Sequence, residues 1–410
     1  MSQYTPPTQA DFELYYQGRL ADPYPLYDWL RREDPVHWSE PFHGWLLTRY
    51  ADVKTALGDP TRLCSSLRVD ANMDRLPTAG GVDMAAFSRI LSRWVINLDP
   101  PDHTRIRNLV NKAFTPRLVE SLRPRIQSTV DELLDATQDA GQMEVMRDLA
   151  FPLPAIVISD MLGVPAQDRD QFKQWPEEIV AFLGSSHLKV DKAKRAKRSM
   201  LAMRDYVVDI AEQRRRQPQD DLISKLVTVA ERGDALTADE LFALCINIMV
   251  AGYETTMALI ANGILLLLRN PDQLQNLRRN PQSMETAVEE FLRYETPLQN
   301  QDRVAAVDLK IADVPIRKGQ RVLIMLGAAN RDPAQFSHPE QLDITRADNQ
   351  HLAFGFGTHF CIGAPLARLE GQIAIRSVIN RFPNLKLAGP EVVWRENASV
   401  RNPASLLVDL

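Results

Sequence analysis

The chain has 410 residues, of which 45% are hydrophobic and 25% charged, and it carries a formal net charge of −5 at pH 7. This length and composition suffice for a large buried core, and the mild acidity argues against a nucleic-acid-binding protein, which would usually carry an excess of Lys and Arg. The three cysteines, Cys64, Cys245 and Cys361, lie far apart and form no CxxC pair. Such a sparse set is not a disulfide framework, and it favours a reducing, cytoplasmic location.

The sequence pattern predicts one compact, mainly α-helical domain over residues 1–410, with small β-sheets. The 27 prolines are scattered between helical stretches, without a repeat or a Gly/Ser-rich linker. Apolar and polar residues alternate in two regions, Val36–Thr48 and Val304–Leu326, which predict strands. Helices are expected at Tyr24–Arg32, His103–Ala113, Pro116–Ala136, Ala155–Leu162, Ala193–Arg214, Ala238–Leu268, Ser283–Tyr294 and Ala364–Arg381.

A functional loop and a helix start are predicted in the first quarter of the chain. The stretch Arg62–Asn97 contains no long regular pattern, which is typical of a functional loop. Two prolines and Asp102 follow it and predict the start of a helix. His103 and Arg107 lie four residues apart in this helix, so they share a face and could together hold a carboxylate.

The stretch Leu241–Leu268 is mostly apolar and long enough to cross a bilayer. Glu254 and Thr255 lie in its middle, however, and a charged residue at mid-bilayer is costly. We therefore expect a long core helix with a functional interruption and no membrane span.

The small residues Ala251 and Gly252 directly precede this interruption. The Thr255 hydroxyl can bond back to the Ala251 carbonyl, four residues earlier, which bends a helix and opens space beside its backbone. By themselves these residues are as consistent with a polar kink in a core helix as with a site.

Two further motifs follow in the C-terminal third. Glu290 and Arg293 share a helix face, a pattern that on its own usually marks a solvated ion pair. The second motif is the segment 354–363, FGFGTHFCIG, in which glycines allow the backbone to bend tightly around Cys361. A helix is predicted directly after it, and a helix N-terminus favours a thiolate. Cys64 and Cys245 have no such surroundings and are expected to be inert.

Together these motifs resemble those of cytochromes P-450. Segment 354–363 is similar to the haem-binding loop of that family, segment 251–256 to its oxygen-activation motif, and Glu290 and Arg293 precede the loop in the family's order. The resemblance covers nearly the whole chain. It implies the cytochrome P-450 fold, mainly α with small β-sheets, and a haem b (iron protoporphyrin IX) cofactor whose iron is bound by the metal ligand Cys361.

The resemblance also implies the roles of individual residues. Glu254 and Thr255 would be catalytic and would relay protons to bound O2. Glu290, Arg293 and Arg346 would form a buried structural ion pair. The resemblance implies that the haem contacts His103, Arg107, Ala251, Gly252, Arg303, Phe354, Gly355, His359, Cys361 and Gly363. Of these residues, His103, Arg107, Arg303 and His359 would bind the propionates.

The implied activity is that of a monooxygenase that inserts one oxygen atom from O2 into a small lipophilic molecule by hydroxylation. No flavin or nicotinamide motif is visible, so electrons would come from a separate ferredoxin or flavodoxin with its reductase. We expect neither nucleic acid nor membrane as a partner. A basic docking patch for the electron donor is expected at Lys112, Arg117, Arg123 and Arg368. Substrate contacts are implied at Arg62–Asn97, Phe172–Arg198, near Asn247, Pro297–Asn300 and Ala398–Pro403.

Two alternatives remain open at this point. A haem-thiolate sensor or carrier would need the same cysteine loop but would have no use for Glu254 and Thr255. A peroxide-driven oxidation, a dehydration or an oxidative coupling could use the same fold. The acid and the alcohol favour O2-dependent hydroxylation, whereas the sequence does not choose between a terpenoid, a steroid, a fatty acid and a polyketide.

Overall fold

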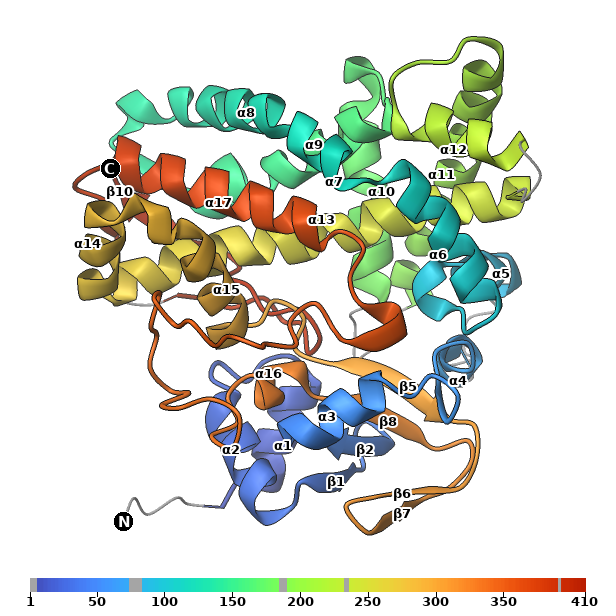
Figure 1. Cartoon of the computed structure of the whole chain (residues 1–410), viewed down its shortest axis with the longest axis vertical. Helices are drawn as coiled ribbons and strands as arrows, with labels where there is room; N and C mark the ends of the chain where they lie inside the picture. The colour runs from blue at the N-terminus through green and yellow to red at the C-terminus, as the bar shows by residue number, and fades with distance from the viewer. Residues whose placement is uncertain (1–5, 74–82, 184–189, 232–235, 390–391) are drawn as a thin grey trace. The chain divides into compact units, whose positions relative to one another are not determined.

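The computed structural model describes residues 6–73, 83–183, 190–231, 236–389 and 392–410, which fold mainly into helices with small β-sheets (Figure 1). The predicted fold class is confirmed. The chain forms two compact units: unit 1 comprises residues 1–63, 123–153 and 254–410, and unit 2 comprises residues 64–122 and 154–253. The single domain over 1–410 stays a prediction.

The larger sheet has the strand order β1-β2-β8-β5-β3. β1 and β2 form an antiparallel hairpin, β2 pairs parallel with β8, and β8 pairs antiparallel with β5. The strands are β1 Val36–Ser39, β2 Gly44–Leu47, β3 Leu63–Cys64, β5 Gln301–Ala305 and β8 Arg321–Ile324. Strands were therefore correctly predicted in both Val36–Thr48 and Val304–Leu326.

Side-chain alternation along β2 and β8 divides the sheet between two apolar clusters. Leu47 and Ile324 pack with helix α3 (Tyr50–Leu57) on one face. Leu46 and Leu323 pack on the other face with α1 and α2. The bounds of these two helices are α1 Gln9–Tyr16 and α2 Tyr24–Glu33. Figure 1 shows all three helices beside β1, β2 and β8.

The rest of unit 1 consists of helices around the end of the long helix α13 and of short strands. β4, β10 and β9 form one small sheet, and β6 and β7 form a hairpin. These elements are α8 Arg123–Asp135, η2 Gln138–Ala140, β4 Gln142–Glu144, η3 Met146–Ala150, α14 Pro271–Arg279, η5 Pro281–Ser283, α15 Met284–Tyr294, β6 Leu309–Ile311, β7 Val314–Ile316, α16 Leu326–Ala329, η6 Gly357–His359, α17 Ala364–Arg381, β9 Lys386–Leu387 and β10 Leu407–Asp409.

Helix α13 (Ala238–Arg269) is the long apolar helix that the sequence predicts. Its most apolar 18-residue window has a mean hydropathy of 1.5, but 78% of that window is buried. The helix is therefore a core helix, as expected.

Glycines allow the second half of α13 to pack closely against α17. A Cβ at Gly263 would lie 2.6 Å from Ile375 Cδ1, and a Cβ at Gly371 would lie 2.9 Å from Leu259 Cδ2. Both distances are too short for a real side chain, so larger residues would push the helices apart. This contact holds α17, and the cysteine loop that leads into it, against the half of α13 that carries Glu254.

Unit 2 is helical apart from the end of β3. Its elements are α4 Arg68–Met73, α5 Ala85–Leu91, η1 Val95–Asn97, α6 Asp102–Ala113, α7 Pro116–Ser121, α9 Pro152–Leu162, which begins at the unit boundary, η4 Ala166–Asp168, α10 Arg169–Leu183, α11 Val190–Arg216, α12 Leu222–Glu231 and the first half of α13.

Two of the element predictions were wrong. The stretch Arg62–Asn97 is not an irregular loop, because its described part contains α4 and α5; residues 74–82 lie outside the described residues. The helix expected at Pro116–Ala136 is divided at Leu122 into α7 and α8. Pro124, near the start of α8, has no backbone N–H to bond to the carbonyl four residues earlier, which is why a continuous helix is unfavourable here.

The ion pair predicted between Glu290 and Arg293 is confirmed, and both side chains are 0% exposed. Arg293 donates to the carboxylate from Nε and Nη2 at 2.8 and 2.7 Å, and Arg346 Nε donates to it at 3.1 Å. Arg293 Nη1 and Nη2 also donate to three backbone carbonyls within residues 330–341, at 2.9 to 3.1 Å. One buried guanidinium therefore fastens the segment that leads to the cysteine loop onto α15.

Replacing Arg293 with Ala should be strongly destabilising, because it would leave the Glu290 carboxylate buried without its main partner. We expect a loss of about 3–5 kcal/mol in the free energy of unfolding. Arg317→Ala is the matched control, because it removes an ion pair with Asp308 whose side chains are 70% and 60% exposed. That change should cost at most about 1 kcal/mol. Denaturant unfolding of both variants measures the difference, and equal losses would contradict the structural role of Arg293.

Candidate functional site

The cysteine loop folds back on itself before α17. The Cys361 N–H donates to the Phe354 carbonyl at 2.9 Å, and the Gly355 N–H donates to the Leu352 carbonyl at 2.8 Å. Gly355 and Gly357 have φ angles of +74° and +69°, which only glycine adopts without strain. These two positive φ angles allow the chain to reverse, so that Cys361 lies next to Phe354.

Cys361 differs from the other two cysteines in its surroundings. It is exposed and lies between Phe360, which is 40% exposed, and the start of α17 at Ala364. Cys245 is fully buried, and burial raises the pKa of its thiol to about 12. An accessible sulfur ahead of a helix N-terminus and beside an exposed aromatic ring fits a flat, largely apolar group that carries a soft metal ion.

Two of the predicted propionate contacts, Arg303 and His359, belong to unit 1. Arg303, on β5, is 3% exposed, and its Nη2 donates to Gln301 Oε1 at 3.2 Å. A Cβ at Gly355 would lie 3.7 Å from both Gln301 Nε2 and the His359 carbonyl. Gln301 thus bonds to Arg303 and lies close to Gly355, so Arg303 lies near the loop that carries His359.

The other two predicted propionate contacts, His103 and Arg107, belong to α6 in unit 2. His103 is 1% exposed and Arg107 is half-buried. They share a helix face, as the sequence predicts, and the grouping of all four residues around one ligand stays a prediction.

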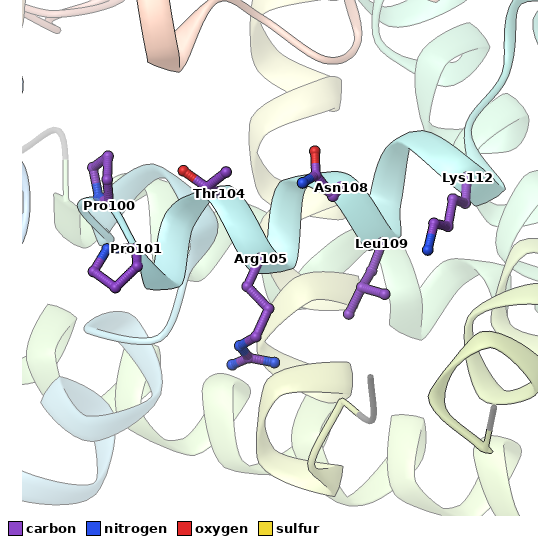
Figure 2. Close-up of a pocket in the computed structure, with 7 residues that line it drawn as sticks. All are labelled: Pro100, Pro101, Thr104, Arg105, Asn108, Leu109 and Lys112. Carbon is purple, nitrogen blue, oxygen red and sulfur yellow. The ribbon is translucent and has the colours of Figure 1, made fainter. Parts of the chain in front are cut away.

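An open depression of about 810 Å³ runs along α6 (Figure 2). Its lining includes Arg105 and Lys112 but neither His103 nor Arg107. It is therefore a surface feature separate from the predicted site.

Between Leu241 and Leu267, helix α13 is buried except along one stripe of residues. From Leu241 to Leu267 every residue is buried except Ile248, Ala251, Gly252 and Thr255. These residues recur at the spacing of one helix face. The predicted site residues Ala251, Gly252 and Thr255 therefore lie on the face of α13 that the protein leaves open. Gly252 also has a packing role, because a Cβ there would lie 2.8 Å from Ile158 Cδ1.

Glu254, next to this stripe, is 7% exposed. Burial raises the pKa of its carboxyl to about 7, and Arg395, whose Nη1 lies 3.7 Å from Oε1, acts in the opposite direction. The C-terminal segment that carries Arg395 is tied to α13, because Asn262 Nδ2 donates to the Arg401 carbonyl at 2.9 Å. Near neutral pH this carboxyl can therefore both hold and release a proton.

The structure corrects the role expected for Arg368. Its Nε and Nη2 donate to the two carboxylate oxygens of Glu289, each at 2.7 Å, and its side chain is only 31% exposed. The guanidinium also lies 4.5 Å from the centre of the Phe354 ring. Arg368 is thus engaged inside the fold and is not a free docking cation, whereas Lys112, Arg117 and Arg123 are exposed.

Several residues around the site were not singled out from the sequence. They are Gln301, Glu289, His351 and Arg395. Glu289 has the only local signal, since it directly precedes Glu290 in the EEFLR motif. The other three meet their partners across long sequence separations, and nothing in the local sequence indicates those contacts.

Comparison with known proteins identifies the family. The sequence profile described as Cytochrome P-450 matches residues 81–392. Cytochrome P-450 107B1 of Saccharopolyspora erythraea is 42% identical over 92% of this chain and 92% of its own length. Vitamin D(3) 25-hydroxylase of Pseudonocardia autotrophica is 41% identical over 97% of this chain and 96% of its own. The solved structure of P-450 BioI in complex with an acyl carrier protein ligated to hexadec-9Z-enoic acid is 37% identical, with a TM-score of 0.87, and covers 98% of this chain and 100% of that one.

Glu254→Gln should change how stability depends on pH. The folded-state pKa of about 7 lies above the ordinary value of 4.5, so the folded protein keeps this proton to higher pH. The stability that the proton contributes is complete below pH 4.5 and is lost as the pH rises through 7. Because glutamine stays neutral, the variant should gain up to about 3 kcal/mol over the wild type across this interval. Denaturant unfolding at a series of pH values measures the difference, and a constant difference would show that the carboxyl is not perturbed.

Proposed function

The chain belongs to the cytochrome P-450 family and is a monooxygenase that uses O2 and an organic substrate, and we propose that Cys361 is the ligand of its haem iron. The observation that carries this assignment is the loop geometry, in which the accessible sulfur lies just ahead of α17 and the Cys361 amide is bonded to the Phe354 carbonyl at 2.9 Å. Cys245 does not qualify, because burial raises the pKa of its thiol to about 12 and so keeps it protonated.

We propose haem b as the form of this cofactor. When bound, this cofactor would supply the chemistry of O2 activation, and Cys361 as its thiolate ligand would favour cleavage of the O–O bond. The chain contains no CxxC pair and therefore no CxxCH motif for covalent haem attachment. His103, Arg107, Arg303 and His359 would hold the propionates as cationic or N–H donors.

Glu254 and Thr255 are assigned to proton delivery. A carboxyl with a pKa of about 7 can donate a proton and be recharged at neutral pH, whereas an ordinary glutamate would be ionised throughout. Thr255 follows it on the accessible stripe of α13, where its hydroxyl can pass a proton onward. Arg395 would stabilise the ionised form of Glu254 between successive transfers.

The substrate is assigned to the lipophilic small molecules. Vitamin D(3) 25-hydroxylase and the solved BioI complex with its C16 acyl chain both point to long apolar ligands. Between Leu241 and Leu267 the positions of α13 that are not buried are Ile248, Ala251, Gly252 and Thr255, and the first three of these are small or apolar. Such a face would accept hydrocarbon and would exclude water from the reaction. Parts of the segments expected to contact substrate, residues 74–82 and 184–189, lie outside the described residues.

The electron donor is assigned to a separate ferredoxin or flavodoxin with its reductase. The chain itself has no flavin or nicotinamide motif. The basic side chains of Lys112, Arg117 and Arg123 are exposed, and each would attract an acidic partner, because local charge steers such encounters even in a protein of net negative charge. Such a partner is consistent with a cytoplasmic location.

Cys361→His should remove the thiolate-type absorption of the reduced carbonyl complex, because imidazole would replace sulfur at the iron. The single variants Cys64→Ser and Cys245→Ser should keep it. Difference spectra of the three purified proteins decide the assignment. Retention of the signal in Cys361→His, together with its loss in one of the serine variants, would move the ligand to another cysteine.

Thr255→Ala should uncouple the reaction. The variant should bind haem and substrate and still consume reductant, but product per reductant should fall about tenfold or more, with peroxide released, because proton relay is impaired. Thr255→Ser should restore coupling. Thr256→Ala is the matched control, since Thr256 is 3% exposed and lies off the open face of α13. If Thr255→Ala is coupled as tightly as wild type, the hydroxyl has no role in proton delivery.

A further inference from the structure

Arg368 is held in one orientation by Glu289. Its two parallel hydrogen bonds to Glu289, each 2.7 Å long, form the bidentate pairing that fixes the plane of a guanidinium. Burial alone would raise the pKa of Glu289, but the hydrogen bonds from Arg368 and His351 outweigh it and bring the value to about 2. Glu289 is therefore an anion at every physiological pH.

His351 completes the clamp through both of its ring nitrogens. The Ala353 N–H donates to His351 Nδ1 at 3.1 Å, so Nδ1 must present its lone pair. The ring proton then lies on Nε2, which is 3.1 Å from Glu289 Oε2 and can donate to it. The side chain of His351 is 3% exposed, so this contact lies away from solvent. The cluster of Glu289, Arg368 and His351 thus pairs the Glu289 carboxylate with the Arg368 guanidinium and the His351 ring.

The clamp continues into the cysteine loop through Phe354. The Arg368 guanidinium lies 4.5 Å from the centre of the Phe354 ring, a cation–π contact, and the His351 ring lies 6.0 Å from it. Phe354 is 9% exposed, and its carbonyl accepts the hydrogen bond from the Cys361 amide at 2.9 Å. Movement of Arg368 would therefore remove a contact from the ring of Phe354, the residue whose carbonyl accepts the hydrogen bond from the Cys361 amide.

We propose that Arg368, held by Glu289, to which His351 also bonds, is a positioning residue for the thiolate: it holds Phe354, whose carbonyl accepts from the Cys361 amide, and places one positive charge beside the Phe354 ring. The proposal rests on Cys361 being the iron ligand. Glu289 on α15 and Arg368 on α17 would then keep the sulfur in place and set the reduction potential of the bound iron.

The charges of the clamp predict opposite effects on that potential. Reduced iron carries one more electron than oxidised iron, so a nearby positive charge favours reduction and a nearby negative charge opposes it. Removing the guanidinium should lower the reduction potential, whereas neutralising Glu289 should raise it. A purely structural disturbance would have no reason to give opposite signs.

The experiment measures two properties of the holoenzyme: the midpoint reduction potential, and the rate at which the reduced carbonyl complex loses its thiolate-type absorption on mild warming. Arg368→Gln should lower the potential and Glu289→Gln should raise it, and the double variant should return toward the wild-type value. Arg368→Lys keeps the charge but lacks the planar fork. It should leave the potential nearly unchanged while the thiolate signal is lost about tenfold faster, since Phe354 is no longer held.

Matched controls come from the same two helices. Arg376→Gln on α17 and Glu285→Gln on α15 change the same charges at exposed positions and should move neither property. Potentials that shift in one direction in both clamp variants, that do not shift, or that shift equally in the controls would overturn the proposal. If Arg368→Gln does not retain haem, Glu289→Gln and Arg368→Lys still decide it.

A parallel measurement on Cys361→His distinguishes a wrong ligand assignment from a wrong role for the clamp. If that variant keeps the thiolate signal, the ligand assignment itself is wrong. If it loses the signal while all clamp variants behave like wild type, the ligand assignment stands and the clamp is refuted.

Discussion

Two adjacent carboxylates on α15, Glu289 and Glu290, organise the part of unit 1 that presents Cys361. Burying a carboxylate is costly unless every oxygen finds a fixed cationic or N–H partner. Glu290 meets this requirement with Arg293 and Arg346, and Glu289 with Arg368 and His351. Arg346, Arg368 and His351 come from other segments of the chain. Arg293 lies on α15 itself but bonds to three backbone carbonyls within residues 330–341. Pairing the two carboxylates therefore also fixes the segment before the cysteine loop and the first turns of α17.

The same physics has the opposite result at Glu254. The side chain of Glu254 is 9% exposed and that of Glu289 is 27% exposed, and the one described cationic partner of Glu254, Arg395, lies 3.7 Å away on a side chain that is 45% exposed. Burial therefore dominates, and the pKa rises to about 7 where that of Glu289 falls to about 2. Glu289, with two close partners, stays ionised and can anchor other segments, whereas Glu254, with one distant partner, can exchange protons near neutral pH. The two glutamates therefore differ both in how deeply they are buried and in how firmly they are paired.

Both expectations that failed for the helices and loops concern places where local pattern and chain geometry compete. Apolar periodicity continues through Leu122, but the missing N–H of Pro124 divides the helix. The stretch Arg62–Asn97 is too irregular in pattern to predict its short helices, which are stabilised by packing more than by propensity. The expectation that Arg368 belongs to a docking patch failed for a different reason. The local sequence LARLE is typical of a helix surface and does not indicate that Arg368 pairs with Glu289 on α15.

The amino-acid sequence by itself determined the features whose physics is local. The glycines around Cys361, the spacing of Glu290 and Arg293, and the polar interruption of an apolar helix each follow from residues a few positions apart, and each is present in the structure. Only the tertiary structure decided which distant side chains share a buried space. The contacts of Arg395 with Glu254, of Gln301 with Arg303 near Gly355, and of Arg368 with Glu289 and Phe354 depend on how helices and strands pack. Burial and pairing set the charge of a side chain, and neither can be read from its neighbours in the chain.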